Sequence, residues 1–261
     1  MYFMLYDVSM RFDVITIFPK IFSAKGGSTS DGDSYGYFGH SIIKRAVQKR
    51  LISIHTHDLR AYTRDKHKKA DNPPYGGGAG MVLMAEPVIR AVDAVTRKKK
   101  NEKTKIVLFS AKGRSFNQKI AYDWSKKYDR IVFVTGRYEG IDERAAQILK
   151  KEYKKNFEEL SIGPYVLTDG DVASMVVVST IARLIPGVIR TESLEEESHW
   201  SSLLKNEPKK LRAAHYTLHA EYPHYTRPEV MRYKGKNYPV PGVLISGDHK
   251  KIEIWRTSHR S

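Results

Sequence analysis

Four short runs rich in β-branched and aromatic residues alternate with segments of helical periodicity, and this alternation restricts the fold more than any other feature of the chain. Such runs are typical of buried strands. They occupy residues 11–18, 51–57, 105–111 and 130–136. Between them, apolar residues recur at helical spacing in residues 41–51 and after Pro87. The sequence therefore predicts an α/β fold with a mostly parallel sheet and helices on both faces.

The charge of the chain indicates an anionic partner. Lys and Arg total 45 against 29 Asp and Glu, which gives a formal net charge of +16. Nucleic acid is favoured as the partner, and a lysine-rich surface that only aids solubility is the alternative. The apolar run at 175–189 is interrupted by Ser179, Thr180 and Arg183, so it is too short and too polar to span a bilayer. No membrane partner is expected.

The absence of cysteine restricts both chemistry and location. A chain with no cysteine has no disulfide, no thiolate nucleophile and no cysteine-type zinc site. This suits a reducing cytoplasm, and a cytoplasmic location is expected. Residues 1–9 lack a basic start and a small-residue cleavage site, so they are expected to be an extension ahead of Met10 and not a signal peptide.

Changes in composition divide the chain into domains. Residues 23–37 are rich in Gly, Ser and Asp and are expected to form a flexible loop after the first strand. Residues 190–222 pass from acidic to basic and are expected to be a flexible linker. The linker separates a core at 10–189 from a short C-terminal tail at 223–261.

Two glycine-rich turns are candidates for a ligand pocket. One is VTGRYEG at 134–140, and the other is SIGPYVLTDGD at 161–171, which leads into an apolar helical run. Ligands of open parallel sheets bind beyond the carboxyl ends of the strands, where glycine lets backbone amides come close. The alternative is a pair of tight turns that need glycine only for positive φ. Neither turn matches a dinucleotide or nucleoside triphosphate motif.

Two further segments suit contacts with nucleic acid. PYGGGAGM at 74–81 follows a strongly basic stretch, and its flexible backbone could follow phosphates or cover a base. PHYTRPEV at 223–230 combines aromatic and cationic side chains between two prolines, which suits base stacking or phosphate binding. The alternatives are a plain surface loop for the first segment and a proline-stiffened linker for the second.

Six blocks, taken together, resemble the bacterial tRNA (guanine-N1)-methyltransferase family, TrmD. They occur in the family's order between Met10 and about Arg256 and read PYGGGAGM, GRYEGIDER, SIGPYVLTDGD, ARLIPGV, PHYTRPEV and GVLISGDHKKIEIWR. The resemblance implies a SPOUT methyltransferase core with a deep trefoil knot, which topology rules alone would exclude. It also implies that residues 223–261 are a shortened, helical C-terminal domain that binds tRNA. It also implies a homodimer with active sites between subunits, S-adenosyl-L-methionine as donor, and N1 of guanine 37 in tRNA as acceptor. Mg²⁺ is a candidate cofactor because the family is associated with it.

The resemblance also assigns binding residues. The expected donor-binding residues are Ser110, Gly136, Tyr138, Glu139, Gly140, Ile162, Gly163, Pro164, Tyr165, Val166, Leu167 and Gly170. The residues expected to bind the tRNA substrate are His67, Asp71, Gly78, Gly80, His224 and Arg227. A carboxylate such as Glu139 favours the cationic sulfonium of the donor over its neutral product.

The chemistry of guanine requires a base and a cation, because N1 becomes nucleophilic only as its proton leaves and charge builds on O6. By resemblance, Arg183 is the expected cation. Glu197 is the expected base where the family has aspartate, and Glu196 is the alternative. Two other departures, Asp169 in place of a glycine and Ala111 in place of a proline, predict a changed donor geometry.

Three other functions remain open on sequence alone. One is a weakened relative that binds tRNA without modifying it, and another is a SPOUT enzyme with a different RNA target. The pairing of a base with an arginine argues against a ribose target, because a 2′-hydroxyl needs no deprotonated guanine. A plain RNA-binding module is the third, and it would not explain a donor pocket.

Overall fold

The structure of the chain is a computed structural model, and residues 10–22, 36–97, 103–190 and 222–259 are described. It divides into two compact units, Met1–Arg190 and Thr191–Ser261. The predicted catalytic base Glu197 and its alternative Glu196 lie outside the described residues. So do most of the expected loop at 23–37 and most of the expected linker at 190–222.

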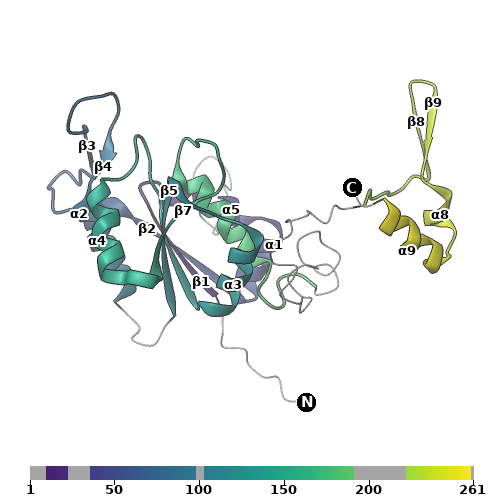
Figure 1. The fold of residues 1–261 in the computed structure, drawn as a ribbon, viewed down its shortest axis with the longest axis horizontal. Coiled ribbons are helices and arrows are strands. Elements are labelled where there is room, and N and C mark those ends of the chain that lie inside the picture. Colours follow the sequence, from purple (N-terminus) through teal and green to yellow (C-terminus); the bar gives the residue numbers. More distant parts are fainter. Residues whose placement is uncertain (1–9, 23–35, 98–102, 191–221, 260–261) are drawn as a thin grey trace, which may run out of the picture. The chain divides into compact units, whose positions relative to one another are not determined.

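A parallel sheet forms the centre of the first unit (Figure 1). In the described residues it has five strands in the order β2-β1-β6-β5-β7, and all neighbouring pairs are parallel. The strands are β1 (Met10–Thr16), β2 (Ile52–Asp58), β5 (Thr104–Ser115), β6 (Arg130–Val134) and β7 (Phe157–Ser161). The predicted parallel α/β sheet is confirmed. The edge strand β7 was not predicted, because Glu158 and Glu159 make its sequence polar.

Helices cover both faces of this sheet, as predicted (Figure 1). On one face lie α2 (Ala85–Thr96) and α4 (Glu143–Tyr153). On the other face lie α1 (Ser41–Gln48), α3 (Gln118–Lys127) and α5 (Gly170–Ala182). Short 3-10 helices join them at Pro19–Phe22, Tyr37–Gly39, Leu59–Tyr62 and Lys154–Asn156. No helix of the described segments has both the length and the apolar character needed to cross a bilayer.

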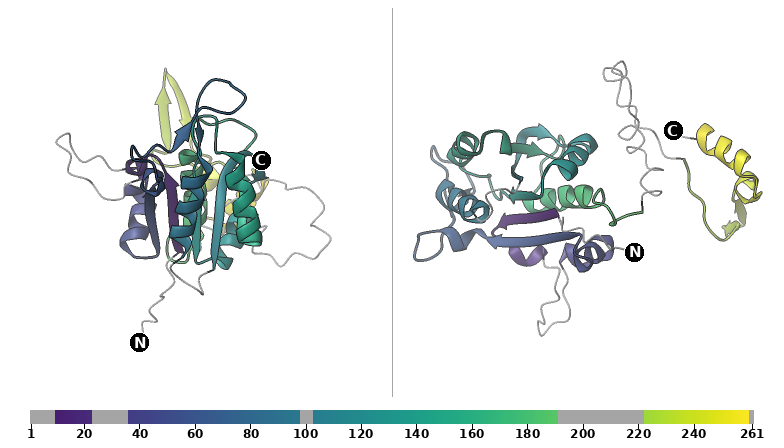
Figure 2. Two further views of the ribbon diagram at one scale, coloured as in Figure 1. Left: turned by 90° about the vertical axis from the view of Figure 1, so that its left-hand side faces the viewer. Right: turned by 90° about the horizontal axis from the view of Figure 1, so that it is seen from below.

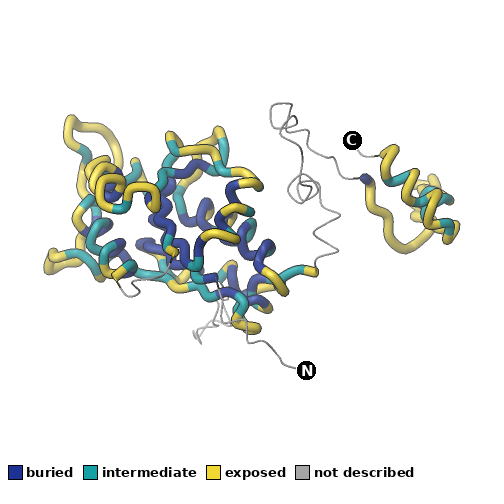
Figure 3. The backbone as a smooth tube through the Cα atoms, turned by 60° about the horizontal axis from the view of Figure 1, so that its bottom comes forward, coloured by how far each residue is buried: buried dark blue, intermediate teal, exposed yellow. Residues whose placement is uncertain are grey.

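The core of the first unit follows the predicted helical spacing. Val88, Ala91, Val92 and Val95 of α2 are buried together with Ile15 of β1 in one cluster. Figure 3 shows that buried residues gather along the strands and on the sides of the helices that face them. Burial of this apolar stripe stabilises α2 against the sheet.

A hairpin lies at the carboxyl ends of the strands (Figure 2). It consists of β3 (Asp71–Asn72) and β4 (Val82–Leu83), which are antiparallel. The Leu83 amide donates to the carbonyl of Gly140 at 3.0 Å, and the Glu139 amide donates to the carbonyl of Met81 at 3.0 Å. The glycine-rich segment at 74–81 therefore lies beside the turn that follows β6.

The second unit contains a hairpin followed by two helices. The hairpin pairs β8 (Val230–Tyr233) with β9 (Lys236–Pro239), and the helices are α8 (Gly242–Ile245) and α9 (His249–Ser258). Lys234 and Gly235 have φ angles of 48° and 75°, which is the geometry of a tight two-residue hairpin turn. A helical tail was expected here, and the hairpin that precedes the two helices was not predicted from the sequence.

A buried carboxylate connects three strands of the sheet. Asp13 of β1 accepts hydrogen bonds from Arg11 Nε and Arg130 Nε at 2.7 Å each, and its Oδ1 lies 2.6 Å from His57 Nε2. The Asp13 side chain is fully buried, and that of Arg130 is 3% exposed. Burial opposes ionisation of Asp13, but the hydrogen bonds from His57, Arg11 and Arg130 outweigh it and hold its pKa well below the usual range.

Candidate functional site

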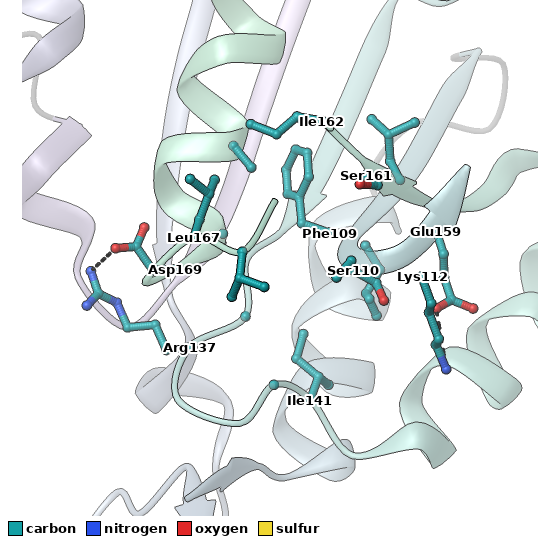
Figure 4. Close-up of a pocket in the computed structure, with 18 of the residues that line it drawn as sticks. Phe109, Ser110, Lys112, Arg137, Ile141, Glu159, Ser161, Ile162, Leu167 and Asp169 are labelled. Atoms are coloured by element: carbon teal, nitrogen blue, oxygen red, sulfur yellow. Dashed lines mark ion pairs between the residues drawn. The ribbon is translucent and has the colours of Figure 1, made fainter. Parts of the chain in front are cut away.

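A cavity of about 500 Å³ lies where β5, β6 and β7 approach their carboxyl ends (Figure 4). Most of its wall comes from residues 108–112, 136–143 and 159–170. The volume is within the range of small-molecule sites in proteins. This is the edge of the sheet at which the two glycine-rich turns predicted a pocket.

An irregularity in β5 carries residues 110–112 into the cavity wall. Leu160 of β7 is paired with Phe109 and again with Arg114, so the residues between these two are displaced from the ladder. Glycine is required at Gly113, because an added Cβ would lie 2.5 Å from the amide nitrogen of Leu160. The displaced backbone brings Ser110 and Lys112 to the cavity.

The two glycine-rich turns contact each other at the end of β6. The Gly170 amide donates to the carbonyl of Gly136 at 2.8 Å, and an added Cβ on Gly170 would lie 2.9 Å from the Gly136 nitrogen. At Gly136 an added Cβ would make only an ordinary contact, 3.5 Å from Ile141. Of these two positions, Gly170 is therefore the one at which the contact between the turns leaves no room for a side chain. Gly140 has a different role, because its backbone adopts a positive φ of +113°.

Two charged clusters lie on opposite sides of the cavity (Figure 4). On one side, Arg137 Nη2 lies 3.4 Å from Asp169. On the other, Lys112 Nζ donates to Glu143 at 2.5 Å and lies 3.8 Å from Glu159 Oε2. The hydrogen bond to Glu143 raises the pKa of Lys112. Within the described residues, Glu159 Oε2 is buried and accepts no hydrogen bond.

Glu139 differs from the other acidic residues of the wall. Each of the others lies within ion-pair distance of a cation; they are Asp142, Glu143, Glu159 and Asp169. For Glu139, the described part of the chain supplies no such cation, and its carboxylate lies against Gly80 of the 74–81 segment. An uncompensated carboxylate in a cavity wall attracts a cationic ligand.

Most of the predicted donor-binding residues line this cavity, and Pro164 does not. Those that line it are Ser110, Gly136, Tyr138, Glu139, Gly140, Ile162, Gly163, Tyr165, Val166, Leu167 and Gly170. Sequence reasoning missed Lys112 and Glu159, because the register change in β5 leaves no signal in the residue pattern. It also missed Arg137, although this residue lies within the GRYEGIDER block.

The residues predicted to bind tRNA lie in separate places. Gly78 and Gly80 have φ angles of +122° and +87° in the segment beside Glu139, and Asp71 pairs with Leu83 at the base of the same hairpin. His67 is exposed in the loop that precedes β3, where its amide donates to Asp65.

The remaining two predicted tRNA-binding residues belong to the second unit. His224 lines a cavity of about 390 Å³ there, with its ring 4.6 Å from that of Tyr222. Arg227 is exposed and precedes Pro228. Arg256 Nε, on the wall of the same cavity, is buried and has no hydrogen-bond partner among the described residues.

The predicted cation Arg183 lies away from the donor cavity of its own chain. Gly170 and Ala173 of α5 line the cavity, and Arg183 caps the opposite end of this helix of 13 residues. At 1.5 Å per residue the two ends are about 20 Å apart, more than an arginine side chain spans. Residues 10–22, 36–97, 103–190 and 222–259 contain no group of three or more metal-ligating side chains.

Comparison with known proteins finds similarity along nearly the whole chain. The family model described as tRNA (Guanine-1)-methyltransferase TrmD matches residues 10–261. The tRNA (guanine-N(1)-)-methyltransferase of Carboxydothermus hydrogenoformans is 42% identical over 248 residues, 95% of this chain and 81% of that protein. The proteins of the same name from Thermomicrobium roseum and Chloroflexus aggregans are 44% and 43% identical, over 95% and 96% of this chain and 77% and 83% of theirs.

Proposed function

The chain belongs to the TrmD family of tRNA (guanine-1)-methyltransferases, and from this premise we propose that it transfers a methyl group from S-adenosyl-L-methionine to N1 of guanine 37 in tRNA. The cavity at the carboxyl ends of the strands carries the proposal, because it brings together the three segments that the sequence assigned to the donor. The net charge of +16 suits a nucleic acid substrate.

The cavity wall suits a donor that is partly apolar and positively charged. Ile141 and Leu167 offer apolar surface, and backbone groups of the glycine-rich turns can read the edge of a base. Bound there, S-adenosyl-L-methionine supplies an electrophilic methyl group on a cationic sulfur. The uncompensated Glu139 favours this cation over the neutral product. Glu159 Oε2, buried and without a hydrogen bond in the described residues, can accept one from a hydroxyl or amino group of the donor.

The transfer requires proton removal from guanine. We assign this step to Glu197, which accepts the N1 proton on its carboxylate, and Arg183 neutralises the negative charge that develops on O6. Because Glu197 has one more methylene than the aspartate of the family pattern, its carboxylate reaches further from the backbone. This affects the rate more than the type of reaction.

The length of α5 and its exposed apolar residues support a homodimer with active sites between subunits. Its residues are apolar around most of the circumference, which is typical of a buried helix. Yet Val172 and Val176, one turn apart, are 44% and 42% exposed in a single chain. A second chain that covers them would also allow Arg183 of one subunit to serve the cavity of the other. The SPOUT-type trefoil knot remains part of the proposal, supported by the close backbone approach of β5 to β7 at Gly113 and by the register shift beside it.

We propose that the protein acts in the cytoplasm. We also propose that the tRNA contacts both units. In the first unit the contacts come from the hairpin segment beside Glu139, through His67, Asp71, Gly78 and Gly80. In the second unit they come from His224 and Arg227, where aromatic and cationic groups adjoin.

The direct test is methyl transfer from labelled S-adenosyl-L-methionine to an unmodified tRNA transcript. We expect label with guanine 37, none with a G37→A transcript, and a loss of about 100-fold in rate for Glu197→Ala. Glu196→Ala is the matched control and should retain the rate. Full activity of Glu197→Ala would move the base elsewhere, and tight tRNA binding with no label would favour a binding protein without catalysis.

Gly170→Ala should weaken donor binding about tenfold, because a Cβ 2.9 Å from the Gly136 nitrogen must push the two turns apart. Isothermal titration calorimetry with S-adenosyl-L-methionine measures this. Gly242→Ala is the control, since an added Cβ at Gly242 meets nothing within 4 Å. Equal donor affinity in wild type and Gly170→Ala would contradict the assignment of this cavity to the donor.

A further inference from the structure

Arg137 joins the two turns that form facing parts of the cavity wall. Its side chain begins on the turn that follows β6, and its Nη2 lies 3.4 Å from Asp169 Oδ2 and 3.1 Å from Asp171 Oδ2, both on the other turn. Figure 4 shows the pair with Asp169 at the edge of the cavity. The backbones of Arg137 and Asp169 also form an antiparallel bridge. The connection therefore involves both side chains and main chain.

The partners of Arg137 are themselves held in place. Asp171 is fully buried and accepts hydrogen bonds from Arg137 Nε and Nη2 and from Thr135 Oγ1, the last at 2.6 Å. Asp169 caps α5 by accepting from the amides of Asp171 and Val172 at 2.9 and 3.1 Å. A planar guanidinium can serve two carboxylates at once, which an ammonium cannot do with the same geometry.

The guanidinium has a further contact that fixes its plane. Its Cζ lies 4.3 Å from the ring centroid of Phe18, in the segment that follows β1. The side chain of Arg137 is 25% exposed, so its ion pairs are partly shielded from solvent. Charge, packing and main-chain pairing therefore all hold Arg137 in one position.

We infer that Arg137 is a positioning residue, which holds the two turns at the separation that a sulfonium nucleoside requires before that ligand arrives. The inference rests on the proposed use of this cavity for S-adenosyl-L-methionine. A wall that is ordered in advance loses less conformational entropy on binding. Arg137 therefore governs the affinity for the donor, while the methyl transfer step proceeds through other groups.

Two substitutions distinguish the positioning role of Arg137 from the capping of α5 by Asp169 and from a simple effect of the positive charge of Arg137. Arg137→Lys keeps the charge but loses the fork in which Nε and Nη2 both donate to Asp171 while Nη2 also lies beside Asp169. Asp169→Asn keeps a side-chain oxygen that can cap α5 but removes the ion pair with Arg137. We expect each substitution to raise the Kd for S-adenosyl-L-methionine about fivefold, measured by calorimetry on the full chain.

Two further readouts test positioning directly. The Kd for S-adenosyl-L-homocysteine, which lacks the positive sulfur, should rise by the same factor, because the change is geometric and not a change of charge. In steady-state assays the KM for the donor should rise, while kcat at saturating donor stays within about twofold. A purely structural role would lower kcat together with thermal stability.

The control is Asp248→Asn in the second unit. Asp248 also caps a helix, α9, and pairs with Lys251 at 3.2 Å, but it does not line this cavity. Donor affinity should be unchanged in this variant. If both Arg137→Lys and Asp169→Asn bound the donor with wild-type affinity, the inference would be overturned. A decrease in kcat with no change in the Kd or KM for the donor would also overturn it. Failure of the wild-type chain to bind the donor would overturn the proposed function itself.

Discussion

Arg183→Ala will lower kcat for methyl transfer by about 100-fold while the Kd for the donor stays at the wild-type value. Arg183 follows the last residue of α5, about 20 Å from the end of the helix that lines the donor cavity, so its loss leaves that cavity intact. Its charge is needed only as negative charge builds on O6 of the guanine. Single-turnover rates with saturating tRNA, together with calorimetry for the donor, separate the two effects.

Arg183→Lys should recover part of the rate, because it retains a cation without the planar guanidinium. Arg190→Ala is the control, as an exposed arginine seven residues further along the chain. Mixed dimers test the placement between subunits. A chain with Arg183→Ala and a chain with its cavity blocked by Gly170→Val should recover activity together, since one complete site remains if Arg183 acts across the interface. No recovery in dimers shown to be mixed would place Arg183 and the cavity in the same subunit.

Asp13→Asn will lower the free energy of unfolding by about 3 kcal/mol at neutral pH. Arg130 is 3% exposed and would lose its charged partner in β1, and an amide with one oxygen can no longer accept from both His57 and the two arginines. Urea denaturation followed by circular dichroism measures the change. Asp123→Asn, which breaks an exposed pair with Lys119, is the control and should have little effect. A change at Asp13 as small as that at Asp123 would contradict the prediction.

The same carboxylate predicts a dependence of stability on acid. The pKa of Asp13 is lower in the folded chain than its ordinary value of 3.8, so the folded state binds this proton less readily than the unfolded state does. The contribution of Asp13 is therefore complete above about pH 5 and is lost as the pH falls through 3.8 toward the lower folded-state pKa. Asp13→Asn should flatten this part of the acid unfolding curve.

Much of the fold could be predicted from the local residue pattern. The elements that were not predicted have a physical reason for lacking such a pattern. The four predicted strands are rich in β-branched residues and lie inside the sheet or at its β2 edge, so pattern and burial agree. The strand at the other edge, β7, is stabilised partly by charge. Its Glu158 lies 2.7 Å from Lys105 Nζ, and a pairing of this kind produces no alternation of apolar residues.

The position of the site was predicted from the sequence, but the contacts that shape it were not. Glycine pattern and resemblance led to the cavity, but they gave no reason to prefer Gly170 over Gly136 as the position of closest approach. That distinction depends on two turns 34 residues apart meeting in space, which spacing along the chain does not reveal. Asp169 was recognised only as a departure from a glycine; in the structure it caps α5 and pairs with Arg137.

The charge cluster around Asp13 and the cavity lie at opposite ends of the same strand, β6. Arg130 begins β6 and joins the buried charge cluster, whereas Gly136 follows the end of that strand and lines the cavity. Six residues of extended chain, about 20 Å, separate the two. The determinants of folding and of ligand choice therefore occupy different ends of one element. Substitutions at the cavity end can therefore change which ligand binds without disrupting the charge cluster that stabilises the fold at the other end.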